Sequence, residues 1–214
     1  MTEDTMTFDV PAKAFAAALA AACVPAAKAK KTSTLECVRI EVEGSRCTVI
    51  GSDSYSLVVA ELPLAHPAAS SAAWNLRPDA PTVRILTAAA KTAQSATVTV
   101  VDHVASIAIG GSVVSVLTDD RGYPRWENLF GPSVVELASP ISLSAERLGH
   151  VSAAAKASRQ FLNTNDRKSP GRNLALPVTI TSAQGPEKPF AFEWPGRGDV
   201  APSVRYLLMP TRTN

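Results

Sequence analysis

The sequence predicts an α+β fold made of repeated units, in which each unit packs one helix on a small antiparallel sheet. The first observation is that a strand, a helix and a group of close strands recur after about sixty to eighty residues. The second is that the strands are short and separated by tight turns, for example at residues 43–45 and 110–111.

The first unit begins with a weakly alternating strand at residues 6–10. Pro11 suits the first turn of a helix, where its missing amide donor costs nothing. Phe15, Leu19 and Cys23 then fall at i, i+4 and i+8, and the rest of this helix is almost entirely alanine. We therefore predict an amphipathic helix. Strands are predicted to follow it at residues 35–42, 47–50 and 57–64.

Two further units are predicted from the same pattern. In the second, Asp79 is suited to cap the N-terminus of a helix, because its carboxylate accepts hydrogen bonds from free amides. In the third, Ser144 takes the same position before a helix that ends near Ser158. The predicted strands of these units are residues 74–76, 97–101, 104–110, 113–117, 176–181, 190–194 and 204–209.

Residues 119–131 (DDRGYPRWENLFG) place Tyr123, Trp126 and Phe130 in a short segment with Pro124. The proline prevents a long helix or strand from running through it. We predict that this segment leaves one core and packs against it, so that a complete domain of two repeats (1–130) precedes a shorter domain (131–214). The alternative is an ordinary surface loop with a few buried aromatic side chains.

Composition narrows the function. With 214 residues, 46% of them hydrophobic, the chain can bury a core, and its net charge of +2 gives no bulk attraction for a polyanion. Cys23, Cys37 and Cys47 lack disulfide or zinc spacing, which fits a reducing cytoplasm. The apolar run at residues 15–24 follows an acidic leader and is too short for a membrane span, so we expect neither a secretory signal nor a membrane association. We also expect no cofactor and no metal.

No sequence motif indicates an enzyme. GxSxG, P-loop and HExxH patterns are missing, and His66, His103 and His150 lie in unrelated contexts. Asp119 and Asp120 are adjacent, so in an extended chain they point to opposite faces and make a poor acid and base pair. We expect a binding protein.

Five stretches carry a resemblance to a known family: TFDVPAKAFAAALAAA, LECVRIEVEG, CTVIGSDSYSLVVAEL, GYPRWENLF and RYLLMPTR. Their order and spacing resemble the bacterial-type β sliding clamps, the processivity factors of replicative DNA polymerases. The resemblance implies the DNA clamp fold, a ring around duplex DNA and no bond chemistry. Because this chain has room for two domains where those clamps have three, it looks like a short, phage-encoded version.

A clamp must slide, so the resemblance implies weak, sequence-independent contacts between its helices and phosphates. In the second helix the basic residues recur on one face, and in the third we expect Leu148, Val151 and Ala155 to form the core stripe. The alternative is that these charges only solvate an outward helix face. The residues expected to meet DNA are Lys13, Lys28, Lys30, Lys31, Arg84, Lys91, Arg147, His150 and Lys156.

The resemblance also implies a hydrophobic cleft for short peptides of the polymerase and the clamp loader. It is formed by the (T/S)-D-x-x-S-L stretch and the C-terminal Met-Pro segment, and methionine suits it because the flexible thioether adapts to different ligands. The alternative is that Met209 only makes core contacts of a terminal strand. The residues carried over are Asp53, Tyr55, Leu57, Leu208, Met209, Pro210 and Arg212.

The resemblance implies a ring of six like domains, which favours three copies of a two-domain chain joined head to tail through strand edges. The expected edges are residues 113–117 in the first domain and residues 190–194 or the C-terminal strand in the second. The alternative function is a clamp-like interaction module that binds replication proteins without encircling DNA.

Overall fold

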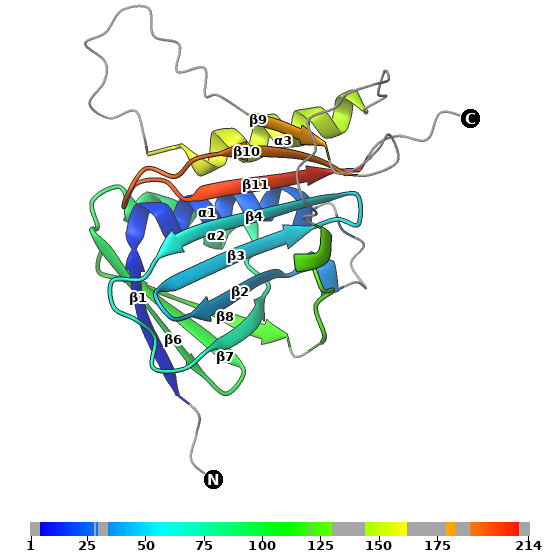
Figure 1. Cartoon of the computed structure of the whole chain (residues 1–214). Coiled ribbons are helices and arrows are strands. Elements are labelled where there is room, and N and C mark those ends of the chain that lie inside the picture. Colours follow the sequence, from blue (N-terminus) through cyan, green and yellow to red (C-terminus); the bar gives the residue numbers. More distant parts are fainter. Residues whose placement is uncertain are drawn as a thin grey trace, which may run out of the picture.

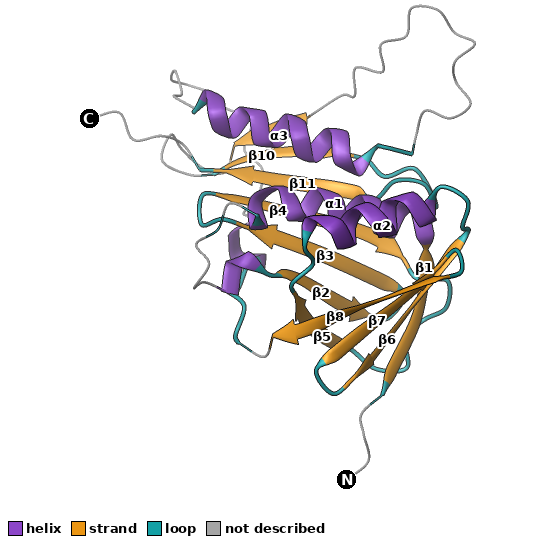
Figure 2. Cartoon of the chain, turned by 180° about the vertical axis from the view of Figure 1, so that it is seen from behind, coloured by secondary structure: helices purple, strands orange, loops and turns teal. Residues whose placement is uncertain are grey.

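The computed structural model describes residues 5–27, 29, 34–119, 121–129, 144–161, 179–182 and 189–209. Within these residues, one curled antiparallel sheet of eleven strands carries three α-helices on one face (Figures 1 and 2). The predicted α+β class is confirmed. The predicted domain boundary at residues 130 and 131 falls outside the described part of the chain.

The elements follow the predicted order. The first repeat comprises β1 (Met6–Pro11), α1 (Ala12–Ala26), the short 3-10 helix η1 (Thr34–Glu36), β2 (Val38–Glu43), β3 (Arg46–Ser52) and β4 (Ser56–Pro63). The second comprises β5 (Ala72–Leu76), α2 (Ala80–Ala90), β6 (Ser95–Val101), β7 (Val104–Ile109) and β8 (Ser112–Asp119), and η2 (Glu127–Leu129) follows it. The last comprises α3 (Ala145–Ser158), β9 (Thr179–Ser182), β10 (Phe190–Trp194) and β11 (Ser203–Leu208).

The first strands of the two complete repeats are exchanged. The sheet order is β1-β6-β7-β8-β5-β2-β3-β4-β11-β10-β9, so β1 joins the strands of the second repeat and β5 joins those of the first. Among the described strands, the ladder pairing between the two groups is limited to Asn75 and Leu76 of β5, which pair with Asp119 and Thr118 of β8. This short contact lets the sheet curl, as the view in Figure 1 shows.

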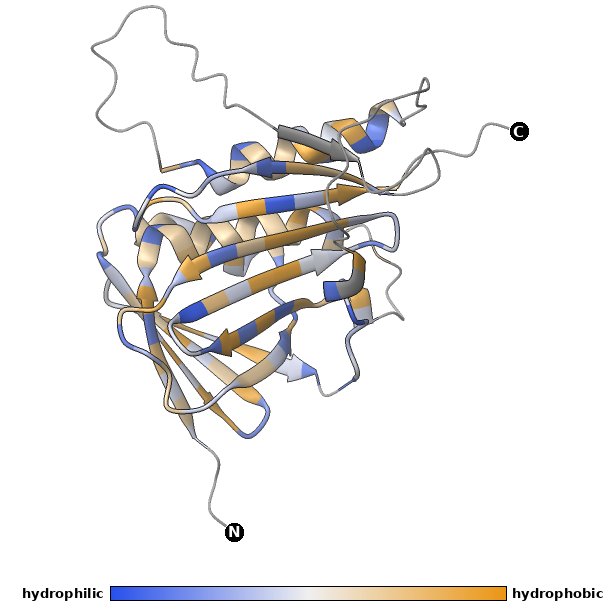
Figure 3. Ribbon diagram, in the orientation of Figure 1, coloured by the Kyte–Doolittle hydropathy of each residue, from blue (hydrophilic) through white to orange (hydrophobic). Residues whose placement is uncertain are grey.

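The predicted amphipathic character of α1 is wrong. Its alanines are as buried as its stripe of larger residues, and Ala14, Ala17, Ala18 and Ala21 have no exposed surface. Small side chains on every face allow α1 to contact β3 and β4 on one side and both α2 and α3 on the other. Hydrophobic residues accordingly predominate along α1 and along the strands beneath it (Figure 3).

The core stripe of α3 is also shifted from its prediction. Val151, Ala154 and Ser158 are the buried residues, whereas Leu148 is 39% exposed. Ser158 is tolerated there because its hydroxyl accepts a 2.9 Å hydrogen bond from Nε1 of Trp194. At the helix starts, Asp79 Oδ1 accepts from the amide of Thr82 at 2.7 Å, as predicted, while the side chain of Ser144 makes no capping bond.

The strand edges differ in part from the prediction. β10 pairs with both β9 and β11, and β11 pairs with both β10 and β4, so neither is an edge. Among the described strands, β1 and β9 pair on one side only, and β8 pairs with β7 along its length but with β5 only at its last two residues. The edge predicted at residues 113–117 is therefore present, and the edge in the last repeat is β9 in place of the predicted strands.

Candidate partner-binding pocket and helical face

The loop between β3 and β4 is organised by one carboxylate. Oδ1 of Asp53 accepts hydrogen bonds from the amide of Tyr55 (2.9 Å), the amide of Ser56 (2.7 Å) and the hydroxyl of Ser56 (2.8 Å). Ser54 has a positive φ of 77°, which the loop can hold because these bonds fix its neighbours. The role of Asp53 is therefore to position Tyr55.

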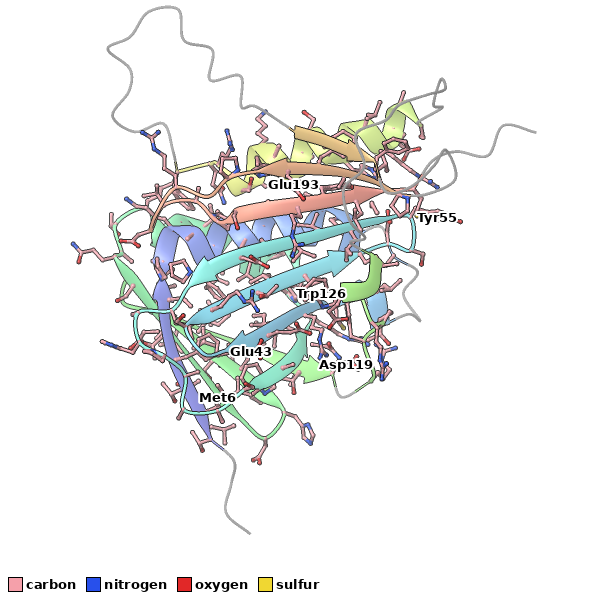
Figure 4. All side chains as sticks on the ribbon, viewed as in Figure 1. Met6, Glu43, Tyr55, Asp119, Trp126 and Glu193 are labelled. Carbon is pink, nitrogen blue, oxygen red and sulfur yellow. The ribbon has the colours of Figure 1, made fainter. Side chains whose placement is uncertain are left out.

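A small apolar cavity of about 220 Å³ lies beside this loop. The amide of Met209, just after β11, donates a 2.9 Å hydrogen bond to the carbonyl oxygen of Tyr55, which brings the end of the described chain to the loop. Tyr55 stands at the edge of the molecule, with 54% of its surface exposed (Figure 4). The lining residues are Ser52, Ser54, Tyr55, Ser56, Leu57, Leu129, Pro189, Leu207 and Met209.

The structure brings three of the predicted pocket residues, Tyr55, Leu57 and Met209, to this cavity. Leu208 does not line it, because it points to the opposite face of β11 and is fully buried in the main core. Leu207 takes its place. Alternation along a strand puts Leu207 and Met209 on one face and Leu208 on the other, and this signal was present in the sequence. Pro210 and Arg212 lie outside the described residues.

The aromatic-proline segment covers the outer face of the sheet. Tyr123 and Trp126 pack against a second, small core whose buried members belong to β3, β4, β10 and β11. Burial raises the pKa of the Tyr123 hydroxyl well above its usual range. The segment then enters η2, and Leu129 reaches the apolar cavity. Phe130 lies outside the described residues. The members of this outer core are Ile50, Leu57, Val59, Ala191 and Leu207.

Leu129 and Pro189 line the apolar cavity but were not predicted from the sequence. Both are distant in sequence from the strands that build the rest of the cavity. Only the path of the 119–129 segment and the start of β10 bring them there, and the sequence gives no local signal for either.

Arg147, which is predicted to meet DNA, contacts the ring of Tyr55. Its guanidinium carbon lies 3.9 Å from the centroid of the Tyr55 ring, at the rim of the apolar cavity. His150, one turn further along α3, is half-buried, and its Nδ1 atom is buried with no hydrogen-bond partner among the described residues.

Three of the basic residues predicted to meet DNA are exposed on the helical face: Arg84 at α2, Lys91 at its C-terminus and Lys156 on α3. All three α-helices lie on the same face of the sheet (Figure 2). Lys13 on α1 is half-buried. The remaining predicted lysines, Lys28, Lys30 and Lys31, lie outside the described residues.

The outer face also holds a charged cavity of about 310 Å³. Its charges are largely paired with one another: Glu61 lies 3.2 Å from Arg205 and 4.0 Å from Arg46, and Arg46 lies 3.4 Å from Glu43. We therefore regard it as an ion-paired surface of the sheet. Its lining residues are Glu41, Glu43, Arg46, Thr48, Glu61, Trp126, Glu127 and Arg205, two of which are labelled in Figure 4.

Asp119 is a structural anchor. Its Oδ2 atom lies 2.6 Å from Arg121 and 2.8 Å from Arg77, and both arginines also approach Glu36. Hydrogen bonds from Arg121 hold the pKa of Asp119 well below its usual value. The network joins η1, the residue that follows β5 and the end of β8, where the sheet curls. Asp120 lies outside the described residues.

The described part of the chain contains no group of three or more His, Cys, Asp or Glu side chains that could hold a metal ion. No helix within it is both long enough and apolar enough to cross a membrane.

Solved structures with the same fold include bacterial sliding clamps. The DNA polymerase III beta chain of Streptococcus pneumoniae aligns with a TM-score of 0.66 and 10% identity over 98% of this chain and 66% of that one. The DnaN sliding clamp of Pseudomonas aeruginosa, solved with bound griselimycin, aligns with a TM-score of 0.61 and 13% identity over 98% of this chain and 65% of that one. The beta clamp of Helicobacter pylori, in complex with 5-chloroisatin, aligns with a TM-score of 0.61 and 13% identity over 100% of this chain and 68% of that one.

The chain therefore has the sliding-clamp fold. It spans just under two thirds of the length of the first two of these clamps. No protein-family model and no curated protein matches the sequence, and identities of 10 to 13% show the fold alone.

Proposed function

We propose that this protein is a sliding clamp, a non-enzymatic processivity factor that encircles duplex DNA and tethers a replicative DNA polymerase in the cytoplasm. The observation that carries the proposal is the apolar cavity between Tyr55 and Met209 in a chain with the clamp fold. The cavity is small for a cofactor but suits one or two apolar side chains of a peptide. Its polymerase and clamp-loader ligands would be short linear segments.

The helical face supports the DNA-binding part of the proposal. Arg84, Lys91 and Lys156 are exposed there, so they can attract phosphates through loose, solvated contacts. Such contacts carry no sequence information, as sliding requires.

Ring closure would use the open edges of β8 and β9. β8 of one copy would pair with β9 of the next, so that the sheet continues from subunit to subunit in a head-to-tail ring. Three copies are favoured if each contributes two of six like units. We further propose the 1–130 and 131–214 division and a phage origin, on the basis of the sequence resemblance alone.

A second candidate is an interaction module that binds replication proteins without encircling DNA. It is favoured by the same cavity, because capture of a peptide does not require a closed ring.

The two functions differ in whether the protein stays on a closed circle of DNA. The protein would be incubated with a clamp loader, ATP and either a nicked circular plasmid or the same plasmid cut once, and then passed through a gel-filtration column at moderate salt. A clamp stays with the circle and slides off the linear molecule. Equal loss from both, with peptide binding retained, would favour the interaction module.

Removing positive charges from the helices tests separately whether the helical face binds DNA. Replacing Arg84, Lys91 and Lys156 with Gln should weaken duplex binding, and its salt dependence should flatten by up to about 0.9 for each phosphate that is no longer neutralised. The control variant, Arg46→Gln with Arg125→Gln, removes exposed positive charges away from the helices. An unchanged slope in the triple variant would remove these helices from the DNA-facing side.

A further inference from the structure

The buried face of α3 begins with a charged residue. Arg147, Val151, Ala154 and Ser158 fall at i, i+4, i+7 and i+11, which places them on one side of the helix. The last three are buried in the core. A guanidinium group at the start of such a stripe is costly to place unless it has a partner.

The partner that Arg147 has is the Tyr55 ring, at 3.9 Å, and not a carboxylate. No ion pair joins Arg147 to any acidic side chain within the described residues, including Glu146 beside it. Oδ1 of the Asp53 carboxylate makes three bonds within its own loop, and no ion pair joins Asp53 to Arg147. Among the side chains that the structure describes, Arg147 therefore has no directly bound carboxylate.

A guanidinium whose partner is an aromatic ring, as that of Arg147 is, makes no hydrogen bond to the ring carbons that would use up its N–H donors, so they can still bind an oxygen acceptor. These donors match the two oxygens of a carboxylate, which they can bind in a bidentate manner. Tyr55 lines the apolar cavity, so a ligand that fills the cavity passes next to Arg147. The site thus combines an apolar cavity with a cation at its rim.

We infer that Arg147 is a specificity-determining residue of this pocket, which selects partner segments that carry a carboxylate beside the apolar side chains in the cavity. The inference rests on the proposed capture of peptides. The carboxylate belongs either to an Asp or Glu side chain or to the C-terminus of the partner.

The opposing explanation is that Arg147 only fastens α3 to the β3–β4 loop. In that case its removal would lower stability and weaken every peptide ligand to the same extent. The two explanations therefore differ in how the effect depends on the charge of the ligand.

The probes are three fluorescein-labelled peptides of nine residues that share one leucine- and phenylalanine-containing core. One carries Asp beside the core with an amidated C-terminus, the second carries Asn with an amidated C-terminus, and the third carries Asn with a free C-terminal acid. Fluorescence polarisation would give their Kd values for the full chain, for Arg147→Gln and for Arg147→Lys. Arg197→Gln is the matched control, since it removes the same charge from an exposed arginine in the turn between β10 and β11.

We expect the wild-type protein and Arg197→Gln to prefer one of the two acidic peptides over the amidated Asn peptide by about fivefold. The preferred peptide shows whether a side chain or a C-terminus supplies the carboxylate. In Arg147→Gln the preference should vanish while the affinity for the amidated Asn peptide stays within about twofold of wild type. Arg147→Lys should keep part of the preference, because it retains the charge without the planar fork.

A preference that persists in Arg147→Gln would overturn the inference, as would an equal loss of all three peptides with a lowered unfolding temperature. Wild-type binding of every peptide with no preference would also overturn it, while leaving peptide capture intact. If none of the peptides binds the wild-type protein, the proposed capture of peptides fails and this inference fails with it.

Discussion

Gly51 of β3 lies directly against the backbone of Ala22 in α1. A Cβ atom added to Gly51 would come within 1.9 Å of the carbonyl oxygen of Ala22. No side chain can take this position unless the helix and the strand move apart. The contact therefore sets the distance between the helical layer and the sheet, and with it the position of the loop that begins at Ser52.

Gly51→Ala should destabilise the protein by about 3 kcal/mol, the upper end of the cost of overpacking, because the clash is with backbone atoms. The control is Gly149→Ala in the exposed middle of α3, where an added Cβ meets nothing within 4 Å. That variant should stabilise by about 0.5–1 kcal/mol. Urea denaturation of both variants checks the pair, and equal stability of Gly51→Ala and wild type would contradict the packing described.

The sequence predicted most elements because their signals are local. Asp79 marks the start of α2, and Gly44 and Gly110, which both have positive φ, mark the turns at the ends of strands. The exchange of β1 and β5 between the two repeats could not be read in this way. It depends on pairings such as Phe8 with Val98, which are ninety residues apart and have no local signature.

The environment of α1 could not be predicted for a related reason. Alanine is compatible with an exposed helix face and with a tightly packed one, so the pattern around Phe15 and Leu19 did not show that α2 and α3 cover the helix. The environment of Arg147 could not be predicted from the sequence either. A basic residue near a helix start is usually solvent-facing, and only the tertiary structure places this one on Tyr55.

Asp53→Ala should weaken binding at the apolar cavity even though Asp53 does not line it. The variant removes the acceptor of three hydrogen bonds that hold Tyr55 and Ser56 in place, so we expect a decrease of about 1–2 kcal/mol in stability. The affinity for an apolar peptide should fall by about tenfold as Tyr55 loses its orientation. Thermal unfolding and fluorescence polarisation measure the two effects.

Asp53→Asn is the control for this loop, because its amide oxygen can still accept hydrogen bonds although it carries no charge. It should retain most of the stability and most of the affinity. If Asp53→Ala binds the peptide as tightly as wild type does, the loop does not shape the pocket.

Asp119 should make stability depend on pH at the acidic end. Its folded pKa is lowered, chiefly by hydrogen bonds from Arg121, so its contribution is fully present above the unfolded pKa of about 3.9. It is lost as the pH falls further, through the folded pKa. Asp119→Asn should therefore cost about 1 kcal/mol at pH 7, and this difference from wild type should shrink below about pH 4.

Urea denaturation between pH 2.5 and 7 measures the difference. Arg125→Gln, which changes an exposed arginine that has no ion pair among the described residues, should follow the wild-type curve. A cost of Asp119→Asn that stays constant down to pH 2.5 would show that the ion pairs with Arg121 and Arg77 do not stabilise the fold.

Self-association should depend on the open edge of β8. Val113 and Leu117 lie on one face of this strand with 68% of each side chain exposed, and Val104 of β7 lies opposite Leu117. An exposed apolar strip beside unpaired backbone groups is a site where another strand can add, and β9 offers the matching edge. We expect light scattering of the purified protein to give three times the mass of one chain.

Val113→Lys with Leu117→Lys should reduce that mass to a monomer, because charges along an edge strand oppose pairing with a second chain. Both positions are already exposed, so the circular dichroism spectrum and the unfolding temperature of the diluted protein should change little. Leu148→Lys, on the exposed side of α3, is the matched control and should leave the assembly intact. A wild-type protein that is monomeric at micromolar concentration, and remains so on circular DNA with a loader, would contradict the ring. A dimer would leave the sheet edges as the interface but would rule out three copies.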